Sequence, residues 1–364
     1  MGKRVRRIGV MTSGGDCPGL NGVIRAVTRT AIHDYDMEVV GVKDGYLGML
    51  EGRFVKLRSR DVAGILTCGG TILGTTNKAD PFRCAVVRGA KTAFENHSRD
   101  IFKNFNAMKL DALLCAGGDG SLRISHELFK MGLRVIGIPK TIDNDIEATD
   151  VTFGFDSAVQ TAAAAIDAIH TTAQSHHRVM IVEVMGRYAG WIALHSGLAS
   201  GGDIILIPEI PFDINMICDK VKERHRRGKR FSIIVVAEGA KPIGGGVTVR
   251  QIVKDSPDQI RLGGIGNKIG CQIENLTGIE TRVAVLGHLL RGGSPTAFDR
   301  VLATRFGCEA VRLAATGKFG YTVALKGQRI VPVELKRAIA RLRLVKKDSP
   351  LVRIARSLGT AFGD

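Results

Sequence analysis

Short apolar runs alternate with longer amphipathic stretches along most of this chain. The runs are rich in Val, Ile and Leu, and we expect them to form buried strands. The stretches between them repeat apolar residues at helical spacing, as Leu20, Val23 and Val27 do in a helix expected over 18–32. This alternation predicts parallel sheets joined by right-handed crossovers. The expected strands lie at residues 7–11, 38–42, 112–116, 133–138, 179–184, 204–207, 232–237 and 282–287.

Further helices are expected around 90–105, over 156–173 with Asp156-Ser157 as the N-cap, and after Trp191. Residues 241–266 are rich in glycine, which indicates a surface excursion. The basic segment 333–347 predicts an amphipathic helix. We expect it to pack on its own lobe rather than on another subunit or an anionic partner, through Leu335, Ile339, Leu342 and Val345.

Two strand ends carry concentrated charge. Pro139-Lys140-Thr141-Ile142-Asp143-Asn144-Asp145 follows the strand at 133–138, and Gly117-Gly118-Asp119-Gly120-Ser121 follows the strand at 112–116. Open α/β sheets bind their ligands at the carboxyl ends of strands. Together the two segments suggest phosphoryl transfer to a hydroxyl group, although an Asp-Asn-Asp turn can also cap the next helix.

In phosphoryl transfer, Asp119 and Asp143 would have different roles. Asp119 lies among glycines that let phosphates approach, and it suits a Mg²⁺ ion shared with phosphate oxygens. Asp143 suits the base that accepts the hydroxyl proton, with a pKa tuned by Lys140 and Asp145 beside it. A glycine turn at 12–19 leads into a helix, whose free N–H groups also favour phosphate.

Composition narrows the class of protein. The net charge is +17, yet only 5% of the 364 residues are aromatic, so base stacking and a nucleic-acid function are disfavoured. The seven cysteines show no C-x-x-C spacing and form no obvious disulfide framework, which favours a reducing cytoplasm. The apolar runs are too short for a signal peptide or a membrane span, so we expect a soluble protein.

Four arginines lie near expected strand ends in the second half of the chain. Arginine forms bidentate contacts with phosphate, so the group indicates a sugar-phosphate clamp. Each arginine alone is more often a solvated surface charge. The group comprises Arg178, Arg187, Arg282 and Arg291, with His288 between the last two.

At this point the chain resembles the 6-phosphofructokinases, which phosphorylate the 1-hydroxyl of fructose 6-phosphate. The resemblance covers about residues 7 to 310, and its motifs occur in the order of that family. PKTIDND also separates it from the NAD and lipid kinases, which share GGDG. The motifs are TSGGDCPGLN, GGTILGT, GGDGS, PKTIDND, MGRYAGW, AEG and LGHLLRGGSP.

The resemblance implies two doubly wound α/β lobes with mainly parallel sheets and an active site in the cleft between them. It places the phosphoryl donor on residues 1–154 plus about 290–330, and fructose 6-phosphate on residues 155–289. Residues 331–364 would then form a basic, helical C-terminal segment that packs on the lobes. The same resemblance implies a homodimer or homotetramer with sites shared between subunits.

The resemblance also implies roles for single residues. Asp143 would be the general base, and Gly15 and Arg187 count with it as catalytic. Asp119 would hold Mg²⁺. The donor would contact Gly15, Tyr46, Lys78, Gly117, Gly118, Asp119, Gly120, Ser121 and Lys140. Fructose 6-phosphate would contact Thr141, Asp143, Asp145, Met185, Gly186, Arg187, Glu238, His288 and Arg291, with Arg178 and Arg282 reaching in from a neighbouring subunit.

Three positions bear on the identity of the donor. Gly120 resembles the ATP-using forms, because an aspartate there would crowd and repel the α-phosphate of a nucleotide. Lys140 is shared with pyrophosphate users, and Lys78 stands near the place where simple bacterial forms carry an arginine. We expect ATP as the donor, with a reversible pyrophosphate-dependent enzyme as the alternative. A non-catalytic basic binding protein on the same fold is a second alternative, which the intact acids oppose.

Overall fold

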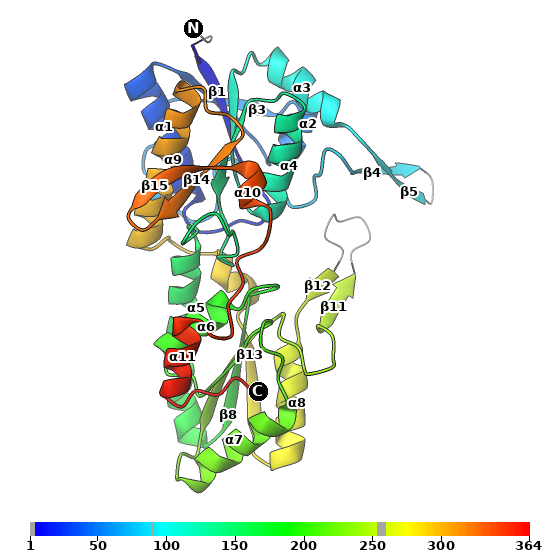
Figure 1. Ribbon diagram of the computed structural model, residues 1–364, viewed down its shortest axis with the longest axis vertical. Coiled ribbons are helices and arrows are strands. Elements are labelled where there is room, and N and C mark those ends of the chain that lie inside the picture. Colours follow the sequence, from blue (N-terminus) through cyan, green and yellow to red (C-terminus); the bar gives the residue numbers. More distant parts are fainter. Residues whose placement is uncertain (1–3, 89–90, 253–259) are drawn as a thin grey trace.

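The computed structural model describes residues 4–88, 91–252 and 260–364. The chain forms two α/β lobes, one above the other in Figure 1, and each lobe is built around its own sheet. This arrangement confirms the expected fold class. None of the helices in the described part of the chain is both long and apolar enough to cross a lipid bilayer.

The larger lobe contains a seven-stranded sheet with the order β15-β14-β7-β6-β1-β2-β3. Its inner strands are parallel, and the two edge strands β3 and β15 pair antiparallel. The strands are β1 (Arg7–Ser13), β2 (Glu38–Val42), β3 (Phe54–Leu57), β6 (Ala112–Gly117), β7 (Val135–Pro139), β14 (Tyr321–Lys326) and β15 (Arg329–Glu334).

Helices cover both faces of this sheet. Two of them, α1 (Leu20–Tyr35) and α9 (Ala297–Ala315), pack together on one face. The opposite face is covered by α2 (Tyr46–Glu51), α3 (Ser98–Ala107), α4 (Asp119–Lys130) and α10 (Leu335–Ala338). Both faces of the central strands are therefore buried, as their continuous apolar runs require.

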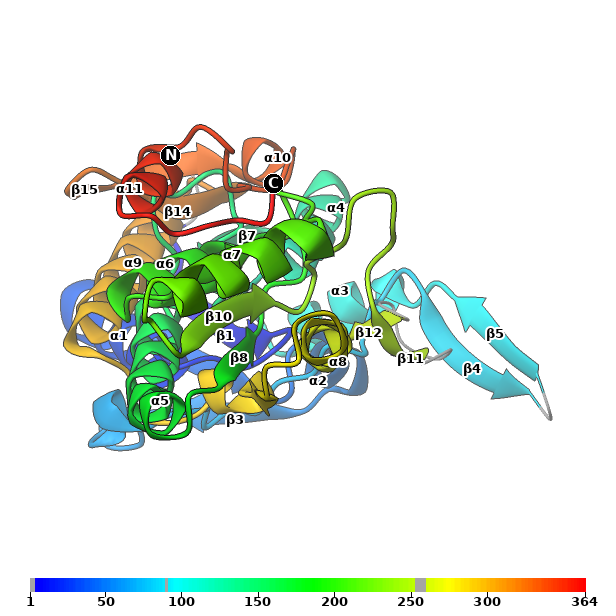
Figure 2. The ribbon, with the colours of Figure 1, turned by 90° about the horizontal axis from the view of Figure 1, so that it is seen from below.

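The smaller lobe contains a four-stranded parallel sheet with the order β13-β8-β10-β9. Its strands are β8 (Val179–Val184), β9 (Ile204–Leu206), β10 (Ser232–Ala237) and β13 (Thr281–Val285). One face carries α5 (Phe155–His176) and α6 (Trp191–Ala199), and the other carries α7 (Ile214–Arg226) and α8 (Ile265–Thr277). Near the C-terminus, α11 (Pro350–Ser357) lies beside α6 (Figure 2).

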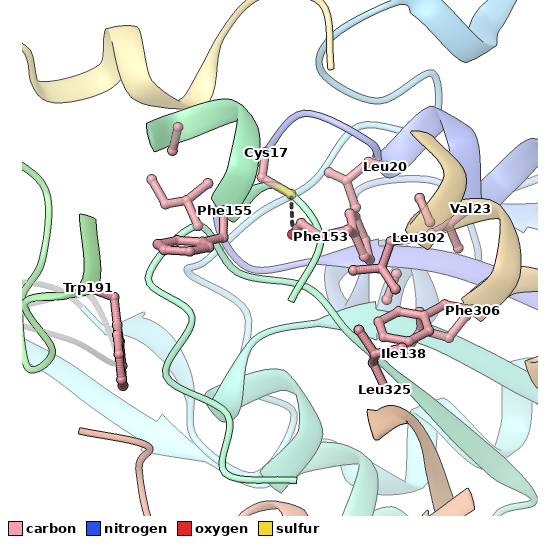
Figure 3. Close-up of a cluster of buried hydrophobic side chains, with 14 of the residues drawn as sticks. Cys17, Leu20, Val23, Ile138, Phe153, Phe155, Trp191, Leu302, Phe306 and Leu325 are labelled. Carbon is pink, nitrogen blue, oxygen red and sulfur yellow. Dashed lines mark hydrogen bonds between the residues drawn. The ribbon is translucent and has the colours of Figure 1, made fainter. Parts of the chain in front are cut away.

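A continuous apolar core joins the lobes (Figure 3). Phe153 and Phe155 lead into α5, and the Phe153 ring meets the Phe306 ring of α9 edge-on with centroids 6.4 Å apart. The Cys17 thiol, at the turn before α1, donates to the Phe153 carbonyl over 3.9 Å. The N-termini of α5 and α9 also meet at this junction, where the Asp299 carboxylate accepts the Ser157 N–H over 2.8 Å.

Two hairpins extend from the lobes (Figure 1). The first pairs β4 (Cys84–Arg88) with β5 (Lys91–Glu95), and the second pairs β11 (Val249–Ile252) with β12 (Ile260–Leu262). The helix expected around 90–105 is therefore wrong in its first half, because only residues from Ser98 onward are helical. The second hairpin lies within the glycine-rich excursion, of which residues 253–259 fall outside the described ranges.

Two other local predictions are wrong. The N-cap of α5 is Gly154, whose φ of 95° suits glycine, and Asp156 lies in the first turn instead. The amphipathic helix over 333–347 is replaced by the end of β15, the short α10 and an irregular stretch. In that stretch the N–H groups of Arg343 and Val345 bond to Asp145 O and to the Glu209 carboxylate rather than to a helical turn. Leu335, Ile339 and Val345 are nevertheless buried.

Candidate active site

A cavity of about 510 Å³ opens at the carboxyl ends of three adjacent strands, β1, β6 and β7. Their last residues are in register, since Ser13 pairs with Gly117 and Gly117 pairs with Pro139. Each loop that follows one of these strands lines the cavity. Asp119 and Asp143, which are separated in the chain by α4 and β7, therefore face the same space.

The turn after β1 is held from several sides. Gly14 donates its N–H to Thr76 O over 3.0 Å and accepts the Thr75 hydroxyl over 2.7 Å. The Lys140 ammonium donates to Gly15 O. A Cβ added at Gly15 would lie 2.8 Å from Arg291 Nη1, so a side chain there would displace the end of that arginine.

The loop after β6 places Asp119 at the first position of α4. The first N–H groups of a helix have no partner within it, so this end of α4 offers donors and a positive dipole end to phosphate. The Asp119 carboxylate accepts from Arg123 Nε, one turn later, over 2.7 Å. Gly117 is required by close packing, since a Cβ there would lie 2.3 Å from Ser121 Cβ.

The turn after β7 directs two carboxylates into the cavity. The Asp143 N–H donates to the Thr141 hydroxyl over 3.0 Å, and Asn144 between the two acids has φ 53°. Asparagine tolerates this left-handed conformation better than most residues. The Asn144 side chain accepts the Thr152 N–H over 3.1 Å, which holds the turn in place.

Burial raises the pKa of both acids of this turn. For Asp145, burial and the neighbouring charge of Asp143 raise the pKa to about 7. Burial likewise raises the pKa of Asp143, against the opposing charges of Arg291, Lys140 and Arg187. No hydrogen-bond donor among the described residues satisfies Asp143 Oδ1, which is buried. That oxygen is available to a substrate hydroxyl.

Lys140 lies beside both the turn after β1 and the turn that carries Asp143 and Asp145. Its side chain is only 3% exposed, and burial lowers the pKa of its ammonium group. Its backbone N–H donates to Gly117 O over 3.0 Å, so the loops after β6 and β7 are joined at this residue.

The smaller lobe contributes a second group of side chains. Met185, Gly186 and Arg187 follow β8, and Glu238 follows β10. Burial and the charges of Asp143 and Glu183 raise the pKa of Glu238 to about 7, while Arg291 and Arg187 oppose the rise. These electrostatic effects place Glu238 near Asp143, across the junction of the lobes. His288 and Arg291 lie in the 3₁₀ turn η2 (Gly287–Arg291) after β13.

Not all of these predicted sugar contacts line the cavity. Arg291 does, and its Nη1 also donates to Asp16 O over 3.0 Å. The Arg187 guanidinium donates to Ile260 O over 3.2 Å and lies 4.9 Å from the centre of the Tyr188 ring. Met185, Gly186, Glu238 and His288 are likewise outside the cavity lining.

Arg178 and Arg282 lie at the opposite end of the smaller sheet. Arg178 precedes β8, whereas Met185 follows it, and six residues of strand span roughly 20 Å. Both guanidinium groups pair with the Glu280 carboxylate, Arg178 through Nε over 2.6 Å. They are therefore remote from the cavity of their own chain.

Three predicted donor contacts, Gly117, Tyr46 and Lys78, lie outside the cavity lining. Tyr46 is fully buried, and its hydroxyl bonds to Ser121 O over 3.1 Å and to Ser125 Oγ over 2.7 Å. It supports the first turn of α4 from beneath and does not face the cavity. The Lys78 side chain is exposed and does not line the cavity, whose wall in this segment is formed by Thr76, Asn77, Ala79 and Asp80.

The cavity also contains residues that sequence reasoning missed. Arg123 and Ile124 line it, as do Thr76, Asn77 and Asp80. Arg123 was detectable in principle, because it follows Asp119 by four residues on the same helix face. The position of Thr76 depends on a long-range backbone bond to Gly14, for which the local sequence gives no signal.

The carboxylates at this site fit a magnesium ion that takes most of its ligands from phosphates. The described residues contain no cluster of three or more His, Cys, Asp or Glu side chains able to hold a metal ion. Mg²⁺ commonly binds through one or two carboxylates together with phosphate oxygens and water. Asp119, at the mouth of a helix N-terminus that favours phosphate, meets that requirement.

Comparisons with known proteins agree with this geometry. The phosphofructokinase family model matches residues 7–314. ATP-dependent 6-phosphofructokinase 2 of Clostridium perfringens is 51% identical over 362 residues, which cover 99% of each chain. ATP-dependent 6-phosphofructokinase of Chloroflexus aurantiacus is 52% identical over 369 residues, covering 100% of this chain and 99% of that protein. A solved phosphofructokinase from Saccharomyces cerevisiae superposes with a TM-score of 0.77 at 33% identity, covering 92% of this chain but only 45% of the yeast chain.

Proposed function

Because this chain belongs to the phosphofructokinase family, we propose that it transfers the γ-phosphoryl group of ATP to the 1-hydroxyl of fructose 6-phosphate. The products are ADP and fructose 1,6-bisphosphate. The observation that carries the proposal is that Asp119 and Asp143 line one cavity, at neighbouring strand ends. A metal-bound donor and a hydroxyl acceptor can meet only in such a shared space.

In the proposed reaction Asp143 accepts the proton of the 1-hydroxyl group. The sugar oxygen forms a bond to the γ-phosphorus as the bond from phosphorus to the β,γ-bridging oxygen breaks, and ADP leaves with that electron pair. Phosphoryl transfer relies on positioning and on neutralisation of charge. Lys140 and Arg291 bring positive charge to the cavity, and Gly15 leaves room for the Arg291 guanidinium beside the turn after β1.

Asp119 would hold the magnesium ion, which neutralises charge on the donor phosphates. Gly118, Gly120 and Ser121 would present backbone N–H groups or free space to those phosphates, and Gly117 would allow Ser121 to pack closely beside it. Thr141 and Asp145 would orient the sugar end that reacts. Met185, Gly186, Arg187, Glu238, His288 and Arg291 would hold the remainder of fructose 6-phosphate, which requires Arg187 to turn from Ile260 toward the site.

We also propose an oligomeric assembly and a cytoplasmic location. Arg178 and Arg282 point away from their own cavity, which supports a homodimer or homotetramer in which a neighbouring subunit supplies them. The seven cysteines are all free thiols, as suits a cytoplasmic enzyme.

A coupled assay tests the reaction. Purified protein is expected to release ADP from ATP only when fructose 6-phosphate and Mg²⁺ are present, and to turn over more slowly with pyrophosphate. Asp143→Asn should reduce kcat by roughly 10²–10⁴-fold while the protein still binds fructose 6-phosphate. Wild-type turnover in Asp143→Asn would exclude it as the base. An absence of turnover with either donor would favour a non-catalytic binding protein.

A further inference from the structure

The chain crosses from the larger to the smaller lobe through residues 341–345, which we name the strap. The red segment in Figure 1 shows this path, from α10 in the larger lobe to α11 in the smaller one. The strap lies beyond residue 314, where the match to the family model ends. None of the motifs that identify the active site includes residues of the strap.

The strap contacts the back of the turn that carries Asp143 and Asp145. The Arg343 N–H donates to Asp145 O over 2.8 Å, and Arg343 Nη1 donates to Asn144 O over 3.3 Å. Leu342 forms an antiparallel bridge with Ile146 immediately after the turn. The peptide units on both sides of Asp145 are therefore hydrogen-bonded to the strap.

The other side of the strap contacts the smaller lobe. The Trp191 indole N–H donates to Arg343 O over 2.8 Å, and the Arg343 guanidinium stacks over the Trp191 ring at 4.3 Å. The Glu209 carboxylate accepts the Val345 N–H over 2.8 Å and the Gly190 N–H over 3.1 Å. Trp191 and Gly190 directly follow the loop that carries Arg187.

We propose that Arg343 is a positioning residue for the phosphoryl-transfer reaction, an inference that rests on the proposed function. The Arg343 backbone and guanidinium group hold the turn at Asn144 and Asp145. The stacking of Arg343 on Trp191 fixes that turn relative to the loop after β8, which carries Arg187 in the smaller lobe. Asn144 has a left-handed backbone, so external hydrogen bonds are needed to keep one conformation. Arg343 supplies one of these bonds and Thr152 supplies another.

The nature of these contacts predicts a specific kinetic effect. The Arg343 side chain neither lines the cavity nor belongs to the predicted contacts of either substrate, so its loss should leave the binding of both substrates nearly unchanged. Misplacement of a reacting group by about 1 Å can cost up to 10²-fold in rate. We therefore expect Arg343→Ala to lower kcat by about tenfold or more, with the KM for fructose 6-phosphate and ATP within about twofold of wild type.

Arg341→Ala is the matched control. It removes the same charge two residues away, from a side chain that is 76% exposed and pairs with Glu147 over 2.7 Å. An exposed ion pair contributes little, so this variant should keep wild-type kcat and KM. Arg343→Lys keeps the charge but loses the planar stack, and its kcat should fall between those of Arg343→Ala and wild type.

Steady-state kinetics on the full chain, with circular dichroism and urea midpoints for each variant, decide the proposal. A folded Arg343→Ala protein with the kinetics of Arg341→Ala overturns it. Should Arg343→Ala fail to fold, Trp191→Phe tests the same link, because it keeps an aromatic ring but removes the N–H that bonds Arg343 O. Reduced kcat at unchanged KM then supports the proposal, and wild-type kcat overturns it. A wild-type chain without any turnover would instead contradict the proposed function.

Discussion

Gly120 leaves space in the donor cavity that a side chain would fill. It lines the cavity, and a Cβ added there meets no heavy atom within 4 Å. Gly120→Asp should therefore fold normally but place a carboxylate against the nucleotide phosphates. We expect kcat/KM for ATP to fall by about 10²-fold or more, because like charges oppose each other in this space.

The donor assay for this substitution has an internal reference. Pyrophosphate has no α-phosphate, so Gly120→Asp should lower kcat/KM for pyrophosphate less than kcat/KM for ATP. Gly120→Ala adds only a methyl group in open space and should retain most ATP turnover. An unchanged kcat/KM for ATP in Gly120→Asp would show that this position does not select the donor.

The buried acids predict how stability depends on pH. The pKa of Asp145 and the pKa of Glu238 are each raised to about 7, from about 4 in an unfolded chain. Between these values the folded state binds more protons than the unfolded state. The free energy of unfolding should therefore decrease as pH rises from about 4 to about 7.

Asp143→Asn tests this electrostatic account, because the Asp143 charge raises the pKa of both groups. Its removal should lower both pKa values and make the decrease in stability with pH shallower. Urea unfolding at pH 5 and pH 8 measures the effect, and Asp143→Asn should gain stability relative to wild type at pH 8. An equal pH dependence in the two proteins would refute the coupling.

Sequence reasoning located the acids more reliably than it located the contacts around them. Asp119 and Asp143 follow apolar strands, and the register of parallel strands necessarily brings such positions to one edge. The direction of a side chain depends on packing instead. Tyr46 was expected in the donor site, yet its ring is buried in the core. It contributes to the site only indirectly, through hydrogen bonds from its hydroxyl to Ser121 and Ser125 of α4.

Glu183 connects two elements of the smaller lobe. It lies on β8 with 2% exposure, and its carboxylate accepts the Gly264 N–H over 2.9 Å and the Gly266 N–H over 2.8 Å. These are the N-cap and an early residue of α8. Glu183→Ala leaves two buried N–H groups without this partner, and should lower the free energy of unfolding by about 2–3 kcal/mol.

Urea denaturation measures this loss, and Glu183→Gln provides the control. Glutamine keeps the length of the side chain and one acceptor oxygen, so its loss should be smaller than that of alanine. Equal midpoints for wild type and Glu183→Ala would mean that α8 does not depend on this contact.

At the scale of elements, periodicity predicted the buried strands well and the surface elements poorly. The strands at 38–42, 179–184 and 232–237 have the predicted bounds, since their apolar runs are set by burial on both faces. The C-terminal segment has a helical apolar pattern, but its backbone bonds to Asp145 and Glu209 instead. Long-range contacts of this kind override local propensity.

The arrangement of the whole molecule separates two groups of predicted substrate contacts. Asp143 lines the cavity, while Arg178 and Arg282 lie at the far end of the smaller sheet, on Glu280. If a neighbouring subunit supplies both arginines, one active site combines residues from two chains. Asp143→Asn and the double variant Arg178→Ala/Arg282→Ala should each be nearly inactive alone.

Hybrid assemblies of these two inactive proteins should regain activity. In a hybrid pair, one site receives both defects and the other site receives neither. In purified hybrid dimers half of the sites are intact, so turnover per dimer should reach about half of the wild-type value. Co-expression of the two chains with different affinity tags, followed by tandem purification and the ADP assay, measures this recovery. If Arg178 and Arg282 acted within their own chain, every site in the hybrid would carry one defect and turnover would stay at the level of the separate variants.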